Sequence, residues 1–439
     1  MTVGKKKWLQ IRQTSCLKGA VTPPSSKSQT IRALFLGLMA KGSSSLNNVL
    51  LADDSVDAMR VCQALGAKVS LLDQHVLCES QGLPFTIGTH SLYAGNSGLT
   101  AKFLLPLLGF RANSHVPIVL DCGEQMRARP IASLVTALCN LGLSIHYLDQ
   151  VGFLPVSVVG SLQGGETFVS GDTSQYLSAL LLALPCAPNA STISVSALCE
   201  RPYLEMTLQW LDQQAIVYEH QRTISHDIFK IPGGQHYTSF HTLIPGDFSS
   251  ASYLIAAAVL LPGCVVLSGL SMQDRQGDKQ LVTLLQSMGA DIQTTPSGFV
   301  IHGGKPLIGR VIDARDIPDL VPTLAVIATQ ALGETQITHV AHARIKETDR
   351  IASMLDGLTR MNALITAHDD GLTIKQSVLR GADVKGYGDH RTVMALSVAG
   401  LMALGETRIE DATAIDKTFP NFVPLMQSLG ALMEVIDVN

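Results

Sequence analysis

A unit of about 73 residues recurs six times along this 439-residue chain, and this repeat constrains the fold more than any other feature of the sequence. Near the end of each unit an amphipathic stretch leads into a short turn and then into an apolar strand. The predicted turn positions, at steps of 76, 72, 75, 73 and 68 residues, are Gly66, Gly142, Gln214, Gly289, Asn362 and Gly430. Gly and Asn are typical just after a helix, where the chain takes the left-handed conformation, and Gln214 is the imperfect copy.

A second pattern keeps the same period. Ala- and Leu-rich stretches end near Gly, Pro or Asn and lead into strands, clearly at 263–267, 333–337 and 405–409 and more loosely at 189–193. The stretches are apolar on most faces, as in 178–184, which indicates buried helices. We therefore expect an α/β fold in which sheets cover inner helices. Six units in a chain too long for one core indicate two domains of three units each.

Composition and motif searches exclude several classes of protein. Hydrophobic residues make up 46% and charged residues 15%, which excludes a disordered chain. The net charge of −4 predicts no nucleic-acid partner. The longest apolar run, 254–261, stops at Pro262, so we expect no membrane span. No long apolar run follows Lys7, so we expect no signal peptide. The eight cysteines form no CxxC pair, which is typical of reduced thiols and a cytoplasmic location.

Isolated cations among small or turn-forming residues interrupt this charge-poor sequence. They lie in five separate segments, at Lys27, Arg129, Arg350, Arg391 and Lys417. In the first segment, Ser and Lys side chains with the amides of a helix start can hold an anion. Arg32 follows Ser28 by one helical turn and therefore lies on the same face.

Other segments add polar groups at predicted helix starts. Arg127 and Arg129 are expected on one face of an extended stretch before a helix. Thr173 and Ser174 are either simple helix caps or ligand-binding hydroxyls. Asp319, in the apolar run 317–322, is likewise either a cap or a carboxylate whose pKa is tuned for proton transfer.

The residues alone indicate an enzyme that acts on a small molecule with several negative charges. The carboxylates Asp319 and Glu347 among these cations are suited to moving a proton. No GxSxG nucleophile and no HExxH or paired-cysteine metal site is found. The repeat alone is also compatible with a second interpretation, a scaffold or clamp that catalyses no reaction.

Nine segments, in order, resemble the 5-enolpyruvylshikimate-3-phosphate synthase family of enolpyruvyl transferases. They lie at 27–32, 96–98, 127–130, 174–175, 201–203, 317–319, 346–350, 389–391 and 417–420. The resemblance implies two globular domains of three βαβαββ units each, joined by a hinge that the chain crosses twice. One domain would comprise 1–22 and 246–439 and the other 23–245.

The resemblance also implies a reaction and roles for single residues. Phosphoenolpyruvate would react with the 5-hydroxyl of shikimate 3-phosphate through a tetrahedral intermediate, with release of phosphate. Phosphoenolpyruvate would be bound by Lys27, Gly98, Arg129, Gln175, Arg350, Arg391 and Lys417. Shikimate 3-phosphate would be bound by Lys27, Ser28, Arg32, Thr173, Ser174, Gln175, Tyr203, Asp319 and Lys346. Proton transfer would use Asp319, Glu347 and Lys27.

Further expectations follow from the same resemblance. It implies no cofactor and no metal, a monomer, and glyphosate as a competitor of phosphoenolpyruvate. The chain departs from the family at Leu99, Lys102, Phe103, Thr173, Glu200 and His342. Glu200 replaces a serine near the substrate phosphate, so we expect that it points away or that another donor serves. The alternatives are a UDP-N-acetylglucosamine enolpyruvyl transferase, whose motifs are not seen at Ser28 or Cys122, and a paralogue with an altered substrate.

Overall fold

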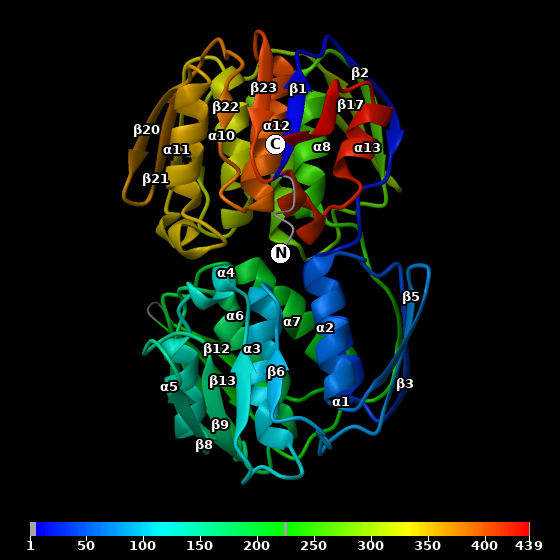
Figure 1. Cartoon of the computed structure of the whole chain (residues 1–439), viewed down its shortest axis with the longest axis vertical. Helices are drawn as coiled ribbons and strands as arrows, with labels where there is room; N and C mark the ends of the chain where they lie inside the picture. Colours follow the sequence, from blue (N-terminus) through cyan, green and yellow to red (C-terminus); the bar gives the residue numbers. More distant parts are fainter. Residues whose placement is uncertain (1–5, 224–225, 439) are drawn as a thin grey trace. The chain divides into compact units, whose positions relative to one another are not determined.

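The computed structural model describes residues 6–223 and 226–438. The chain divides into two compact units: unit 1 comprises the N-terminal segment to Pro24 together with Pro245 onward, and unit 2 comprises Ser25–Ile244 (Figure 1). These boundaries lie within two residues of those expected from the sequence. We propose that the units are the two expected domains, and each is described here by itself.

Unit 2 repeats one α/β motif three times in the described residues. The first repeat comprises α1 (Lys27–Met39), β3 (Gly42–Asn47), α2 (Asp53–Ala64), β4 (Lys68–Leu72) and β5 (His75–Ser80). The second comprises β6 (Ser91–Tyr93), α3 (Gly98–Leu107), β7 (Ile118–Asp121), α4 (Glu124–Arg127), α5 (Ala132–Asn140), β8 (Leu143–Tyr147) and β9 (Val156–Gly160). The third comprises β10 (Gly165–Ser170), α6 (Ser174–Ala183), β11 (Ser191–Ser196), α7 (Arg201–Gln213), β12 (Glu219–Arg222) and β13 (His226–Ile231).

Unit 1 is built in the same way. Its first repeat comprises β2 (Leu17–Val21), α8 (Phe248–Leu260), β15 (Gly263–Ser268), α9 (Gln280–Met288), β16 (Asp291–Thr295) and β17 (Gly298–Gly303). The second comprises β18 (Val311–Asp313), α10 (Val321–Gln330), β19 (Glu334–Thr338), α11 (Arg350–Arg360), β20 (Leu364–His368) and β21 (Gly371–Lys375). The third comprises β22 (Asp383–Val384), α12 (His390–Met402), β23 (Glu406–Ile409), α13 (Phe422–Ser428), β24 (Met433–Val438) and β1 (Lys6–Arg12).

Each repeat forms a four-stranded mixed sheet with one parallel pair. In the third repeat of unit 2 the order is β10-β11-β13-β12, where β10 is parallel to β11 and the other pairs are antiparallel. Strands distant in sequence complete some sheets: β14 (His241–Leu243) pairs with β3, β2 with β15, and β1 lies between β23 and β24. The first and last parts of each unit are therefore joined by backbone hydrogen bonds.

One helix of each repeat lies inside and is buried on nearly all faces. These inner helices are α1, α3 and α6 in unit 2 and α8, α10 and α12 in unit 1. In α8, for example, every residue except Leu260 is buried. The predicted α/β fold with inner helices is confirmed. Among the residues described, no helix combines the length and the apolar character that a membrane crossing requires.

The predicted turns after the helices adopt the left-handed conformation in five of the six copies. Gly66, Gly142, Gly289, Asn362 and Gly430 have φ angles of 98°, 105°, 110°, 70° and 101°. In the third copy the prediction was wrong by one residue, because α7 ends at Gln213 and Gln214 has φ −92°. The left-handed residue is Ala215, with φ 54°, and its amide donates to the Asp212 carbonyl.

Candidate functional site

The residues expected at the site lie mainly where inner helices begin. Polar side chains accept a backbone N–H in the first turn of most of these helices: Ser26 in α1, Ser97 in α3, Thr173 in α6, Asp247 in α8 and Asp389 in α12. Helix N-termini carry unpaired amides and a partial positive charge, so they favour anions. Each unit thus contains a set of capped inner-helix N-termini, which is the kind of helix end that favours anions.

In unit 1 the central feature is Asp319, whose carboxylate contacts two guanidinium groups. It lies in the 3-10 turn Pro318–Leu320 that precedes α10. Its Oδ1 accepts from Arg350 Nη1 at 2.6 Å and its Oδ2 from Arg391 Nη2 at 2.7 Å. The N-cap positions are Ile317 for this 3-10 turn and Leu320 for α10, so Asp319 is the N-cap of neither element.

Arg350 joins this pair to two further carboxylates. Its Nη2 donates to Glu347 Oε2 at 2.6 Å, and its Nε donates to Asp389 Oδ2 at 3.0 Å. The guanidinium is fully buried. Burial would lower the pKa of Arg350, but the charges of Asp389, Glu347 and Asp319 hold that pKa above its ordinary value.

The pKa of Asp319 moves in the opposite direction. Burial alone would raise the pKa of this carboxyl, but the nearby cations Arg391, Arg350 and Lys346 hold it well below its usual range. Asp319 is therefore ionised across the physiological pH range, and it is a weak base as long as both arginines contact it.

Other expected residues of unit 1 surround this network. Lys346, half-buried, directly follows the 3-10 turn Ala341–Ile345, and its charge acts on Asp319. Lys417 is buried at the end of the 3-10 turn Ala412–Lys417. Arg344 pairs with Asp349, which caps α11 by accepting from the Ala352 amide.

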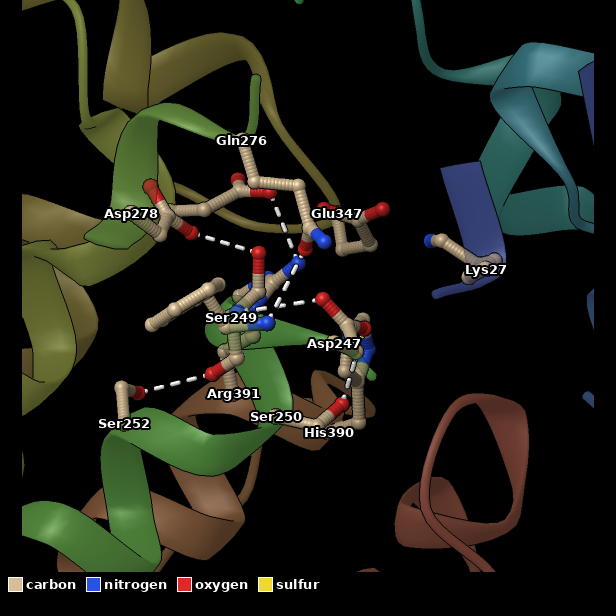
Figure 2. Close-up of polar contacts among 12 residues, drawn as sticks. Lys27, Asp247, Ser249, Ser250, Ser252, Gln276, Asp278, Glu347, His390 and Arg391 are labelled. Carbon is tan, nitrogen blue, oxygen red and sulfur yellow. Dashed lines mark hydrogen bonds and ion pairs between the residues drawn. The ribbon is translucent and has the colours of Figure 1, made fainter. Parts of the chain in front are cut away.

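A buried acidic pair lies at the start of α8 (Figure 2). Asp247 accepts from the Ser249 amide at 3.0 Å and from Ser250 Oγ at 3.0 Å. Asp278 accepts from Ser249 Oγ at 2.5 Å. Burial raises the pKa of Asp278 to about 7, with the charge of Asp319 adding to the rise and that of Arg391 opposing it. Burial therefore outweighs the cation Arg391 at Asp278, the reverse of the balance at Asp319.

In unit 2, α1 carries the expected residues Lys27, Ser28 and Arg32, and Arg32 also contacts a fourth, Tyr203. Lys27 Nζ contacts Asp54 Oδ2 at 3.1 Å, in the first turn of α2. Arg32 donates from Nη1 to the Ser28 carbonyl and from Nη2 to the Tyr203 carbonyl, both at 3.0 Å. Its Nε donates to Thr207 Oγ1 at 2.9 Å. Burial lowers the pKa of Arg32 to about 10, with Tyr203 opposing the shift.

The start of α3 lies against Arg129. A Cβ atom on Gly98 would come within 2.3 Å of Arg129 Nη1, so the glycine leaves the space that this guanidinium fills. Tyr176 of α6 donates to the Pro130 carbonyl at 2.6 Å, which places this segment beside α6.

The expectation of an extended 127–129 segment with both guanidinium groups on one face was wrong. Arg127 ends the short helix α4, and its Nε and Nη2 donate to Asp121 at 3.0 and 2.7 Å. Asp121, the last residue of β7, binds Arg127 through both carboxylate oxygens, whereas the guanidinium of Arg129 lies against Gly98.

At the start of α6, Glu200 accepts hydrogen bonds from the residues expected to bind the substrate phosphate. Its Oε2 accepts from Ser174 N at 3.0 Å, Ser174 Oγ at 2.9 Å and Thr173 Oγ1 at 3.3 Å. Glu200 is buried and has a left-handed backbone, φ 58°. Of the two expectations for Glu200, the one that it points away from these hydroxyls is wrong. Gln175 instead accepts from Lys102 Nζ at 2.7 Å.

Several residues of these networks carried no assigned role in the sequence. Asp389 lies in the segment 389–391 that resembles the family, and an aspartate directly before an apolar helix indicates an N-cap residue. Lys102 was noted only as a departure from the family, and Asp54 and Asp278 gave no signal. Their partners lie 27 and 29 residues away in sequence, so local patterns do not reveal them.

Comparisons with known proteins agree on one family. The family model described as EPSP synthase (3-phosphoshikimate 1-carboxyvinyltransferase) matches residues 11–426. The chain is 41% identical to the 3-phosphoshikimate 1-carboxyvinyltransferase of Acetivibrio thermocellus, over 96% of this chain and 98% of the relative. It is 35% identical to that of Methanocaldococcus jannaschii, over 97% and 99%.

Two solved structures share the fold. EPSP synthase from Acinetobacter baumannii has a TM-score of 0.82 at 24% identity, covering 98% of this chain and 100% of that one. The enolpyruvyl transferase NikO from Streptomyces tendae has a TM-score of 0.79 at 16% identity, covering 99% and 100%. At these identities the likeness concerns the fold alone.

Proposed function

Since the chain belongs to the EPSP synthase (3-phosphoshikimate 1-carboxyvinyltransferase) family, we propose that it transfers the enolpyruvyl group of phosphoenolpyruvate to the 5-hydroxyl of shikimate 3-phosphate and releases phosphate. The reaction lies in the shikimate pathway of aromatic biosynthesis. The names of the relatives do not favour the UDP-N-acetylglucosamine alternative. We further propose that the protein is a cytoplasmic monomer. Sedimentation analysis would measure its oligomeric state.

Phosphoenolpyruvate carries a phosphate and a carboxylate and therefore requires several cations. We assign it to Lys27, Gly98, Arg129, Gln175, Arg350, Arg391 and Lys417. The contacts of Arg350 and Arg391 support this assignment, because each already donates one short, charge-assisted hydrogen bond to the Asp319 carboxylate. An anionic substrate group offers these arginines the same kind of partner.

Shikimate 3-phosphate is assigned to Lys27, Ser28, Arg32, Thr173, Ser174, Gln175, Tyr203, Asp319 and Lys346. Arg32 supports the carboxylate side, since its three observed acceptors are all neutral and a substrate carboxylate would supply a counter-charge. On the phosphate side, Thr173 and Ser174 now donate to Glu200, so a bound phosphate has to share or replace these hydrogen bonds.

Asp319, Glu347 and Lys27 then handle the protons. Asp319 takes the proton of the 5-hydroxyl as that oxygen bonds to C2 of phosphoenolpyruvate. Glu347 with Lys27 supplies a proton to the methylene carbon, which gives a tetrahedral intermediate with a methyl group. Loss of phosphate and of one methyl proton restores the double bond. General acid–base catalysis of this kind contributes typically about 10²–10⁴-fold.

The single observation that carries this proposal is the Asp319 carboxylate held between Arg350 and Arg391. With both guanidinium groups in contact, Asp319 accepts a proton poorly. When anionic substrate groups engage the two arginines, their hold on Asp319 weakens and its pKa rises. Substrate binding would thus activate the base.

The test measures phosphate release from phosphoenolpyruvate with and without shikimate 3-phosphate. We expect release only with both substrates, and a loss of about 10²–10⁴-fold in kcat for Asp319→Asn. Asp313→Asn, an exposed aspartate of unit 1, is the matched control and should retain full activity. Release that ignores shikimate 3-phosphate, or that survives in Asp319→Asn, would overturn the proposal.

A further inference from the structure

Unit 2 contains a cavity of about 760 Å³ at the ends of its inner helices that lie away from the candidate site residues. Its lining includes Met39 at the end of α1, Phe110 at the end of the 3-10 turn after α3, and Cys186 at the end of the 3-10 turn after α6. The candidate residues lie at the opposite ends of the same helices. At 1.5 Å per residue, α1 and α3 separate the two places by roughly 15–20 Å.

All three repeats build the cavity. Each contributes the end of its inner helix and the segment that follows β5, β9 or β13, the strand that ends the repeat. Backbone contacts join neighbouring repeats around it: Lys41 pairs with Thr238, and Phe85 pairs with Arg111. The Asn189 amide donates to the Gln163 carbonyl at 3.1 Å. Backbone contacts between the repeats therefore maintain the cavity. Its volume lies in the range of about 300–1,000 Å³ that is typical of small-molecule sites.

The lining combines apolar walls with positive charge. Met39, Leu83, Phe110 and Leu162 supply apolar surface, and Lys41 and Arg111 supply the cations. Among the described residues that line the cavity there is no Asp or Glu. An apolar hollow with cations and no carboxylate is complementary to an organic anion.

Arg111 is held in a fixed position in this lining. It is buried, and its Nε donates to the Leu108 carbonyl at 2.8 Å. Its Nη2 donates to the carbonyls of Val158 and Ser114 at 3.1 and 3.3 Å. Burial lowers the pKa of Arg111. Because these acceptors are neutral and immobilise the guanidinium, a ligand carboxylate would pay little conformational entropy to meet it.

We propose that this cavity is a second ligand site, which binds a small aromatic carboxylate with its ring against the apolar walls and its carboxylate facing Arg111 and Lys41. Nη1 of Arg111 carries none of these three hydrogen bonds, so it is the nitrogen that would donate a charge-assisted hydrogen bond to the ligand carboxylate. The apolar walls favour a ring over a polyhydroxylated or purely inorganic anion. The site is distinct from the residues assigned to the two substrates.

The test is a fluorescence titration of the full chain with dansylglycine, an aromatic carboxylate, and with dansylamide, which shares the ring system but lacks the carboxylate. We expect dansylglycine to bind about tenfold more tightly than dansylamide. Gln81→Trp, at an exposed lining position, should narrow the cavity and weaken dansylglycine binding about tenfold. Lys41→Met should weaken dansylglycine binding about two- to fivefold.

Two matched variants locate the probe. Lys230→Met, an exposed lysine of β13 outside the lining, should leave the affinity unchanged. Lys27→Met, at the other end of α1, should also leave it unchanged, whether or not the chain has the proposed activity. Arg111 is not replaced, because it holds three backbone carbonyls. Equal affinity for the two probes, full binding by Gln81→Trp, or loss of binding in Lys27→Met would overturn the proposal.

Discussion

Two buried arginines, Arg32 in unit 2 and Arg350 in unit 1, meet the cost of burial in different ways. Arg32 donates to one hydroxyl and two carbonyls, and burial lowers its pKa to about 10. Arg350 donates to three carboxylates, and these hold its pKa above the ordinary value in spite of burial. Neutral acceptors satisfy hydrogen bonds without neutralising the charge, whereas carboxylates do both.

Under the assignments proposed above, this difference gives one repeated fold two kinds of anion site. Arg32 is a buried cation whose observed partners leave its charge unbalanced, so an incoming carboxylate adds the missing counter-charge. Arg350 and Arg391 are already balanced by Asp319, so a substrate anion has to compete with that carboxylate. Under the proposed assignments, this competition would raise the pKa of Asp319 and would link substrate binding to proton transfer.

The largest expected effect separates the two arginines directly. Arg350→Met should lower the free energy of unfolding by about 3–5 kcal/mol, because three carboxylates lose their shared partner inside the protein. Arg32→Met should cost less, about 1–3 kcal/mol, since it leaves only neutral groups unsatisfied. Urea unfolding of both variants at pH 7.5 measures the difference.

Repeating the urea unfolding of both variants at pH 5 sharpens this comparison. Carboxylates left without a cation bind protons more readily, so the loss in Arg350→Met should shrink at low pH while that in Arg32→Met stays constant. Equal losses for the two variants at both pH values would show that the charge of the acceptors does not matter here.

A second prediction concerns the buried carboxyl of Asp278 in unit 1. Burial and the charge of Asp319 raise the pKa of Asp278 to about 7, above its value of about 4 in the unfolded chain. The folded state therefore keeps the proton longer than the unfolded state. The protonated Asp278 carboxyl therefore contributes its full share of the free energy of unfolding below about pH 4, and this contribution is lost as the pH rises through about 7. The loss amounts to a few kcal/mol, at roughly 1.4 kcal/mol per pH unit.

Asp278→Asn removes this dependence, because the amide stays neutral. The thermal midpoint of the variant relative to wild type should therefore rise between pH 5 and pH 8. Asp369→Asn changes an exposed aspartate of the same unit and should show a flat difference over this range. A flat or falling difference for Asp278→Asn would mean that the carboxyl is ionised and well paired.

The sequence predicted the fold because the repeat is local. Turn residues and apolar helices recur within each unit of about 73 residues, and five of six left-handed turns fall where Gly or Asn stands. The error at Gln214 arose because Ala215 occupies the left-handed position without the usual residue type. Completion of sheets by β1, β2 and β14 follows no local pattern, since the pairing strands lie far apart in the chain.

The site was predictable in its cations and less so in their partners. Arg350 and Arg391 stood out against a charge-poor sequence, and both meet Asp319 in the structure. The direction of a side chain was not predictable from residue type: Arg127 bonds to Asp121, and Glu200 turns toward Ser174. These contacts lie within one repeat and join residues 6 and 26 positions apart, so they depend on how the chain turns between the partners, which residue type alone does not display.

A third prediction tests the close packing of Arg129 in unit 2. Gly98→Ala places a Cβ atom where the guanidinium now lies, so the tip of Arg129 has to move. Because only the end of a flexible side chain is displaced, stability should change little. The KM for phosphoenolpyruvate should rise about tenfold, since small misplacements of binding groups weaken substrate positioning. Gly88→Ala, where nothing lies near the added carbon, should leave KM unchanged; equal values for both variants would contradict this role of Arg129.

The smallest expected effect concerns the place where unit 2 resembles unit 1. Glu200 is a buried carboxylate bonded to Ser174 and Thr173, which we assign to the substrate phosphate, so two negative charges would meet at one helix start. Glu200→Gln keeps an oxygen acceptor and removes the charge. The KM for shikimate 3-phosphate should fall about three- to tenfold, with that for phosphoenolpyruvate unchanged. Glu166→Gln, an exposed control, should alter neither. A higher KM in Glu200→Gln would instead mean that the carboxylate orients the two hydroxyls for the phosphate, and that unit 2, like unit 1, uses a carboxylate to position its donors.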